Sequence, residues 1–301
     1  MTAKIPMILS DDVKKARADG TALVALESTL ISHGLPHPEN ITVARAAEDA
    51  VRQHGSTPAT IAVMEGKAHI GLDDEGRKTL ATTEGVAKLS RRDLPVAFSI
   101  SGHRLGATTV SATMILAHHA GIDIFATGGI GGVHRGVEAT MDISADLFEL
   151  AEAPVAVVCA GPKAILDLPR TREYLETMGV TLVGYQCDDM PAFWARSSGL
   201  PVDIRVETAE EIADIINTRK ALNIGGAVLI CNPIPEAMAI DLDVIESWIA
   251  ACLDDAPQGA AATPWLLAEI ARQSKGQSLE ANKQLIINNA GLAGQIARHL
   301  Q

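Results

Sequence analysis

Two ionisable residues follow apolar runs that are typical of buried strands. Glu27 ends the run 22–27, and Lys163 comes shortly after the run 155–159. A carboxyl group beside apolar neighbours holds its proton more tightly, which suits a general acid. Pro162 favours the first turn of a helix, where a cation is disfavoured, so we expect Lys163 to offer a neutral amine for Schiff-base chemistry. The alternatives are a capping or solvated Glu27 and a lysine that merely extends from a first turn.

A glycine-rich segment at 127–136 follows another apolar run. It has four glycines in six residues, so its backbone N–H groups could converge on an anion, and His134 and Arg135 would add positive donors. His134 takes the position of the third glycine of the dinucleotide fingerprint, and the segment also lacks the Lys-Ser/Thr of a P-loop. The pattern predicts a phosphate cradle outside both standard motifs, with a tight or flexible turn as the alternative.

Two aspartates, Asp142 and Asp146, lie four residues apart and would share one face of a helix or one loop. Oxygen ligands without a nearby Cys or His pair favour a hard ion such as Mg²⁺ or Mn²⁺, with water in the remaining positions. The alternative is an N-cap and a solvated acid. A basic cluster at 88–93 could likewise hold an anionic ligand or form a solvated turn.

The elements that would position these residues alternate along the chain. The predicted strands are 22–27, 60–64, 68–72, 96–100, 122–127, 155–159, 181–185 and 227–231, and the predicted helices are 40–54, 108–119, 209–222 and 278–300. A tight hairpin turn is predicted at 65–67. This pattern predicts an α/β fold: a three-layer α/β/α sandwich with a central, mostly parallel (mixed) sheet, formed by residues 1–301 as a single domain. In such folds ligands bind outside the carboxyl ends of the strands.

The composition narrows the class of protein. Across 301 residues, 25 Lys and Arg stand against 37 Asp and Glu, a net charge of −12, which argues against binding to a nucleic acid polymer or an anionic membrane. The hydrophobic fraction of 47% excludes intrinsic disorder. The four cysteines form no Cys-x-x-Cys pair, and no signal peptide or bilayer-spanning run is recognised, so we expect a cytoplasmic protein with reduced thiols.

Nine segments, in unchanged order from about residue 22 to residue 297, resemble the pseudouridine-5′-phosphate glycosidase family, also called indigoidine synthase A-like. They are ALESTLISHGLPHPEN, GSTPATIAVMEGKAHIGL, KLSRRDLP, GATTVSATMILA, FATGGIGGVHRGVEATMDISADL, PVAVVCAGPKAILDLPRTREYLETMGV, PAFWARSSG, NPIPE and SLEANKQLIINNAGLA. The segments TGGIGGVHRG and MDISADL together are very specific for this family. One departure is Pro162, where the family pattern leads us to expect a small residue.

The resemblance implies a lyase or glycosidase of pseudouridine degradation, which converts pseudouridine 5′-phosphate and water reversibly to uracil and ribose 5-phosphate. It implies Lys163 as the nucleophile, Glu27 as the proton donor and Asp142 as the ligand of one Mn²⁺ per subunit, in a homotrimer. The implied substrate-binding residues are Lys88, Val110, Ser144, Ala145 and Asp146, to which we add Thr127 and His134 from the glycine-rich segment, and Asn289.

The residue types suit cleavage of a carbon–carbon glycosidic bond. Such a bond has no heteroatom leaving group, so the paired carboxylates of ordinary glycosidases are not enough. Attack of Lys163 on C1′, with Glu27 protonating the ring oxygen, would open the ribose and leave it bound to nitrogen. Two alternatives stay open: another Schiff-base enzyme acting on a sugar phosphate, such as a lyase, aldolase or isomerase, and a non-catalytic accessory protein of pigment or nucleotide metabolism.

Overall fold

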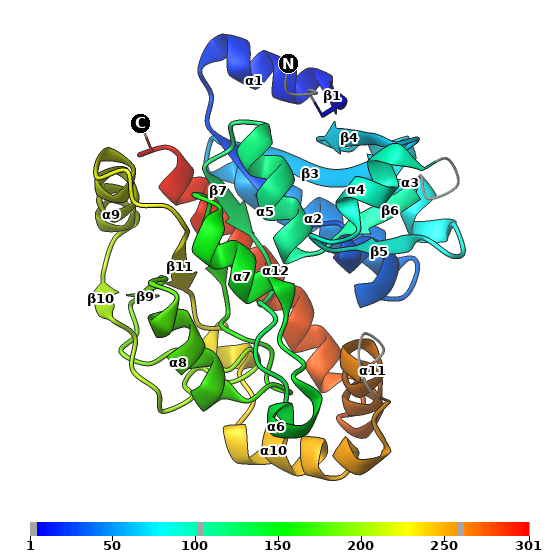
Figure 1. The fold of residues 1–301 in the computed structure, drawn as a ribbon, viewed down its shortest axis with the longest axis vertical. Coiled ribbons are helices and arrows are strands. Elements are labelled where there is room, and N and C mark those ends of the chain that lie inside the picture. Colours follow the sequence, from blue (N-terminus) through cyan, green and yellow to red (C-terminus); the bar gives the residue numbers. More distant parts are fainter. Residues whose placement is uncertain (1–4, 101–104, 258–261, 301) are drawn as a thin grey trace.

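The computed structural model describes residues 5–100, 105–257 and 262–300, and one sheet runs through its centre (Figure 1). The described strands are β1 (Met7–Leu9), β2 (Leu23–Leu26), β3 (Thr57–Met64), β4 (Lys67–Ile70), β5 (Ala87–Leu89), β6 (Leu105–Thr108), β7 (Ile124–Ala126), β8 (Ala156–Cys159), β9 (Thr181–Tyr185), β10 (Ile204–Val206) and β11 (Val228–Cys231). Their order is β1-β4-β3-β2-β7-β8-β11-β9-β10, and β6 joins β5 to β3. Among these strands, only the pairs β3–β4 and β3–β6 are antiparallel. The predicted mostly parallel, mixed sheet is confirmed.

β3 makes the sheet mixed. Residues 57–60 pair with β2 in parallel, whereas the strand's second half pairs with β4 and β6 in antiparallel fashion. Glu65 and Gly66 both have positive φ, 52° and 72°, which suits a two-residue turn between antiparallel strands. The hairpin predicted at 65–67 is therefore confirmed.

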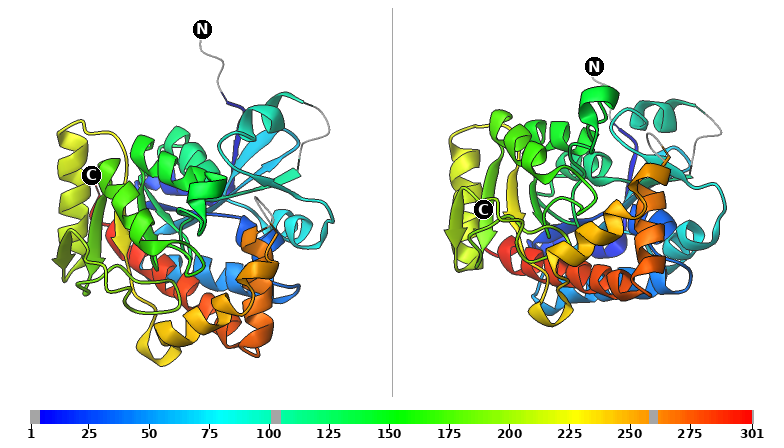
Figure 2. Two further views of the ribbon diagram at one scale, coloured as in Figure 1. Left: turned by 60° about the horizontal axis from the view of Figure 1, so that its bottom comes forward. Right: turned by 90° about the horizontal axis from the view of Figure 1, so that it is seen from below.

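Helices cover both faces of the sheet, as the three-layer prediction requires (Figure 1, Figure 2). One face packs against α2 and α12, with α9 beside α12, and the other packs against α5, which lies next to α7. The described helices are α1 (Asp11–Asp19), α2 (Glu39–Gln53), α3 (Asp74–Thr82), α4 (Leu94–Ser99), α5 (Val110–His119), α6 (Val137–Thr140), α7 (Ala145–Glu152), α8 (Leu168–Thr177), α9 (Ala209–Ala221), α10 (Leu242–Ala250), α11 (Ala262–Gln273) and α12 (Gln277–Ala297). Shorter turns are the π-helical η1 (Leu30–Gly34) and the 3₁₀ turns η2 (Glu236–Met238) and η3 (Leu253–Asp255).

The prediction of a strand at 96–100 is wrong, because this part of the chain forms α4. Pro95 lies in the first turn, where its fixed φ favours a helix. Leu94 and Ala97 are the buried residues and lie three positions apart, which is the spacing of one helical face. A short apolar run does not by itself distinguish a strand from a helix.

The cysteines are free, as expected, and Cys159, Cys231 and Cys252 are buried. Burial raises the pKa of the Cys159 thiol to about 12 and that of Cys187 to about 11. Cys159 ends β8 close to Lys163, but as a protonated thiol at neutral pH it does not compete as a nucleophile. No helix of the described residues is long and apolar enough to cross a membrane.

Candidate active site

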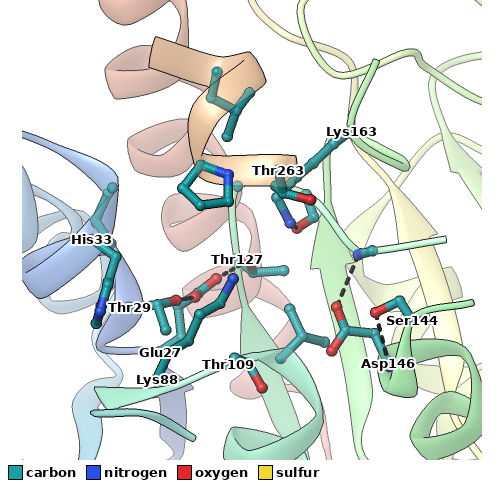
Figure 3. A pocket seen from close by; sticks show the side chains of 18 of the residues that line it. Glu27, Thr29, His33, Lys88, Thr109, Thr127, Ser144, Asp146, Lys163 and Thr263 are labelled. Atoms are coloured by element: carbon teal, nitrogen blue, oxygen red, sulfur yellow. Dashed lines mark hydrogen bonds between the residues drawn. The ribbon is translucent and has the colours of Figure 1, made fainter. Parts of the chain in front are cut away.

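A cavity of about 1370 Å³ opens at the carboxyl ends of the central strands (Figure 3). Its walls come from the ends of β2 and β7, the segment after β8, the amino termini of α5 and α7, and the helices α11 and α12. The predicted site residues that line it are Glu27, Lys88, Val110, Thr127, His134, Asp142, Ser144, Ala145, Asp146 and Lys163. The cavity therefore lies where ligands bind in parallel α/β folds.

Three neighbouring parallel strands bring the reactive candidates together. Leu26 of β2 pairs with Ala126 of β7, so the residues that follow, Glu27 and Thr127, are neighbours. β8 pairs with the other side of β7, and the segment after β8 carries Lys163 to the same edge of the sheet. The convergence follows from the parallel register.

Both carboxylate oxygens of Glu27 accept hydrogen bonds from threonine hydroxyls. Thr29 donates to Oε2, and Thr127 donates to Oε1. The amino group of Lys88 reaches toward this carboxylate (Figure 3). Desolvation by the cavity walls, reinforced by the charge of Lys163, lowers the pKa of Lys88, although nearby carboxylates oppose the change. A lysine in this position can both contact an anionic substrate and balance the charge of Glu27.

Lys163 does not lie at a helix amino terminus, which corrects the sequence prediction. Pro162 forms a parallel bridge with Ile130, and α8 begins only after Asp167. The backbone N–H of Lys163 donates to the carbonyl of Ile130 at 3.0 Å, and its Nζ donates to the carbonyl of Gly129, also at 3.0 Å. A helix dipole therefore plays no part at this lysine, and the glycine-rich segment orients its amine.

The glycine-rich segment has part of its backbone held within the protein. Five of its N–H donors have protein acceptors: Thr127 on Val158 O, Ile130 on Gly161 O, Gly131 on Asp146 Oδ2, Val133 on Thr171 Oγ1 and His134 on Asp142 O. A phosphate cradle formed by other N–H groups of the segment stays a prediction. The glycines also permit close packing. A Cβ on Gly131 would lie 2.2 Å from Ser144 Oγ, and one on Gly132 would lie 2.5 Å from Thr171 Oγ1.

Asp146 holds two walls of the cavity in place. Its side chain is buried, with Oδ2 accepting from Gly131 N at 2.9 Å and Oδ1 accepting from Ser111 N at 3.0 Å. It stands in the first turn of α7, which Ser144 caps by accepting from Asp146 N. The carboxylate thus joins the glycine-rich segment to the amino termini of α5 and α7.

Asp142 lies next to His134, with Oδ2 3.9 Å from the imidazole Nδ1. Burial lowers the pKa of His134, and the charges of Lys163 and Lys88 add to this effect while Asp142 opposes it. The two residues offer a carboxylate and an imidazole on one side of the cavity.

Arg135, expected as a positive donor for an anion, is engaged elsewhere. Its guanidinium pairs with Glu246 of α10 through Nη1 at 2.9 Å and Nη2 at 2.7 Å. Nη2 also donates to the carbonyl of Ala164 at 3.4 Å. Arg135 therefore ties the segment that carries Lys163 to α10.

Asn289 of α12 lies behind the glycine-rich segment. Its Nδ2 donates to the carbonyls of Thr127 at 2.8 Å and Gly128 at 3.3 Å, and its Oδ1 accepts from Asn232. The side chain is fully buried. These bonds support the backbone next to Glu27, whereas a direct contact of Asn289 with substrate stays a prediction.

Several lining residues have no place among the predicted site residues. They include Thr29, His33, Thr109, Phe193 and, from α11, Thr263 and Leu267. Phe193 has a positive φ of 62°, a conformation that phenylalanine rarely adopts and that often marks a functional site. The only sequence signal for Thr29 is its position two residues after Glu27, and α11 gives no signal because its contribution depends on tertiary packing.

Comparisons with known proteins agree with this geometry. Residues 12–299 match the family model described as indigoidine synthase A like protein. Two relatives named pseudouridine-5′-phosphate glycosidase, from Methylobacterium nodulans and Caldanaerobacter subterraneus, are 53% and 52% identical to this chain. The alignments cover 95% and 97% of this chain and 86% and 96% of those proteins.

Two solved structures share the fold. The indigoidine synthase A-like protein from Thermotoga maritima has a TM-score of 0.90 at 33% identity, over 99% of this chain and 97% of that one. The prealnumycin C-glycosynthase AlnA, solved with ribulose 5-phosphate, has a TM-score of 0.90 at 38% identity, over 98% and 97%. This chain belongs to the indigoidine synthase A-like family.

Proposed function

We propose that this protein reversibly cleaves the carbon–carbon glycosidic bond of pseudouridine 5′-phosphate, giving uracil and ribose 5-phosphate. The observation that carries the proposal is the convergence of Lys163 and Glu27 on one cavity from adjacent strands. Relatives at about half identity that are named for this activity support it. An amine and a carboxyl group are the two reacting groups that this cleavage needs.

The reaction would pass through a covalent lysine–ribose intermediate. Nζ of Lys163 attacks C1′ while Glu27 protonates the ring oxygen O4′, so the C1′–O4′ bond breaks and the sugar opens. Nζ then loses a proton, and the lone pair that this leaves on nitrogen forms an imine as the bond from C1′ to uracil breaks. The electron pair of the broken bond stays on uracil C5, which takes up a proton and so balances the one lost from Nζ. Water hydrolyses the imine, releasing ribose 5-phosphate and the free lysine.

The remaining lining residues would bind the substrate. Lys88 supplies positive charge beside Glu27, and Val110, Ser144 and Ala145 stand at the amino termini of α5 and α7, where backbone dipoles favour an anion. The wall at the amino termini of α5 and α7 is completed by Thr127, His134 and Asp146, through the contacts described above. We place the phosphate at this wall of the cavity.

We propose that Asp142 binds one Mn²⁺ per subunit. Within the part of the chain that the structure describes, no group of three or more His, Cys, Asp or Glu side chains could hold a metal ion. A single carboxylate, with His134 beside it, suits a hard ion that keeps most of its ligands as water. Bound there, the ion would offset phosphate charge and order water near the sugar.

Asp142→Asn is expected to weaken Mn²⁺ binding at least about tenfold, because the amide lacks the negative charge that a hard cation prefers. Electron paramagnetic resonance of free Mn²⁺ measures binding directly, without an activity assay. Asp19→Asn, an exposed change at the end of α1, is the matched control. Unchanged binding in Asp142→Asn, or chelator-insensitive activity in the parent protein, would leave Asp142 a structural residue.

Incubating the protein with uracil, ribose 5-phosphate and Mn²⁺ is expected to form pseudouridine 5′-phosphate, detected by mass spectrometry. Conversion of ribose 5-phosphate to a different product in a mixture without uracil would favour another Schiff-base lyase or aldolase. The absence of any reaction with either mixture would favour an accessory protein.

The family resemblance also supports a homotrimer, and the spacing of the cysteines supports a cytoplasmic location. We include both in the proposal.

A further inference from the structure

The hydrogen bonds to Glu27 come from two independent segments. Thr127 reaches Oε1 because the parallel register of β2 and β7 places it next to Glu27. Thr29 reaches Oε2 because the chain turns into η1 directly after β2 and brings its hydroxyl back toward the strand end. The carboxylate is therefore held at both oxygens (Figure 3).

The backbone beneath Thr29 is firmly anchored. Ser28 is fully buried, and its Oγ donates to Ile61 O at 2.7 Å while accepting from Thr108 N at 2.9 Å. Thr29 itself is 9% exposed. Its hydroxyl thus stands in a fixed place relative to the carboxylate, with little freedom to turn toward solvent.

We propose that Thr29 is a positioning residue, which with Thr127 fixes the rotamer of Glu27 and aims its carboxyl group into the cavity. The inference rests on the proposed function, in which Glu27 must carry a proton to protonate O4′. Hydrogen bonds to both carboxyl oxygens restrict rotation of the group. The two threonines therefore aim the carboxyl group in one orientation, which is what transfer of a proton to O4′ requires.

The other charged and titratable groups of the cavity come from different elements. They are His33 of η1, Lys88 of β5, Arg91, Arg92 and Asp93 after β5, His134 and Asp142 of the glycine-rich segment and its continuation, Asp146 of α7 and Lys163 after β8. Thr29→Val leaves all nine in place, so a change in kcat caused by this substitution reports on the position of Glu27.

Thr29→Val removes the hydroxyl and keeps the shape of the side chain. For cleavage of pseudouridine 5′-phosphate, kcat is expected to fall about tenfold, because the carboxyl group is less well aimed, while KM changes little. The split between kcat and KM is a readout that a purely structural role would not move in this way.

Thr29→Ser keeps the donor and is expected to restore the parent kcat. Thr82→Val, which removes an exposed hydroxyl of α3, is the matched control and is expected to leave kcat and KM unchanged. A parent kcat in folded Thr29→Val, or a changed KM without a fall in kcat, overturns the inference, and so does a Thr29→Ser kcat that matches Thr29→Val. If Glu27→Gln loses turnover while Thr29→Val changes nothing, the proposed function stands and only the role of Thr29 fails.

Discussion

Lys163→Ala is expected to lower the cleavage of pseudouridine 5′-phosphate by about 10⁴-fold or more. The loss follows because, among the described side chains, only Lys163 donates an amine N–H to the carbonyl of Gly129, which follows β7. Removal of a covalent nucleophile eliminates the pathway rather than weakening it. Steady-state kinetics measures the loss. Borohydride reduction with ribose 5-phosphate is expected to attach the sugar to Lys163 in the parent protein, and peptide mass spectrometry locates the adduct.

Lys78→Ala, an exposed change in α3, is the control and should retain both turnover and trapping. A trapped adduct on a different lysine, or near-parent turnover in Lys163→Ala, would remove Lys163 from its proposed role. Retained binding of the substrate by Lys163→Ala would show that the cavity is still formed.

Glu27→Gln is expected to lower kcat by about 10²- to 10⁴-fold, which is the usual contribution of a positioned general acid. The amide keeps the size of the carboxyl group, but it provides no acidic proton for O4′. Because ribose 5-phosphate can also react as its open-chain aldehyde, borohydride trapping on Lys163 is expected to survive. The combination of lost nucleotide cleavage and retained sugar trapping separates acid catalysis from nucleophilic attack.

Glu84→Gln, in an exposed turn, is the matched control for the loss of one carboxylate. If Glu27→Gln cleaves the nucleotide at the parent rate, the proton comes from elsewhere. Lys88 would then be the next group to replace, because its amine reaches toward the same place in the cavity (Figure 3).

The sequence predicts the ends of the central strands well, because buried parallel strands appear as short apolar runs. Glu27 and Thr127 stand at such ends, and the fold then brings them together without further information. The strand predicted at 96–100 fails because the same kind of run also fits a short helix that begins at Pro95.

The sequence identifies the glycine-rich segment but not the contacts that hold its backbone. The acceptors of its N–H groups, among them Asp146 and Thr171, lie far along the chain, and local patterning does not reveal them. The prediction that Lys163 lies at a helix amino terminus is wrong for the same reason. Pro162 is used in a bridge to Ile130 and not in a helical turn, and this pairing exists only in the folded protein.

The position of α12 bears on how the protein is made. Asn289 donates to the carbonyl of Thr127, a residue 162 positions earlier, and α12 follows every strand of the sheet in the chain. During synthesis on the ribosome, the strand that ends at Thr127 therefore emerges long before the amide that supports it, with one apolar face still uncovered. The reactive centre of the nascent protein is complete only after its last described helix has been synthesised. A chaperone would protect the chain most during this interval.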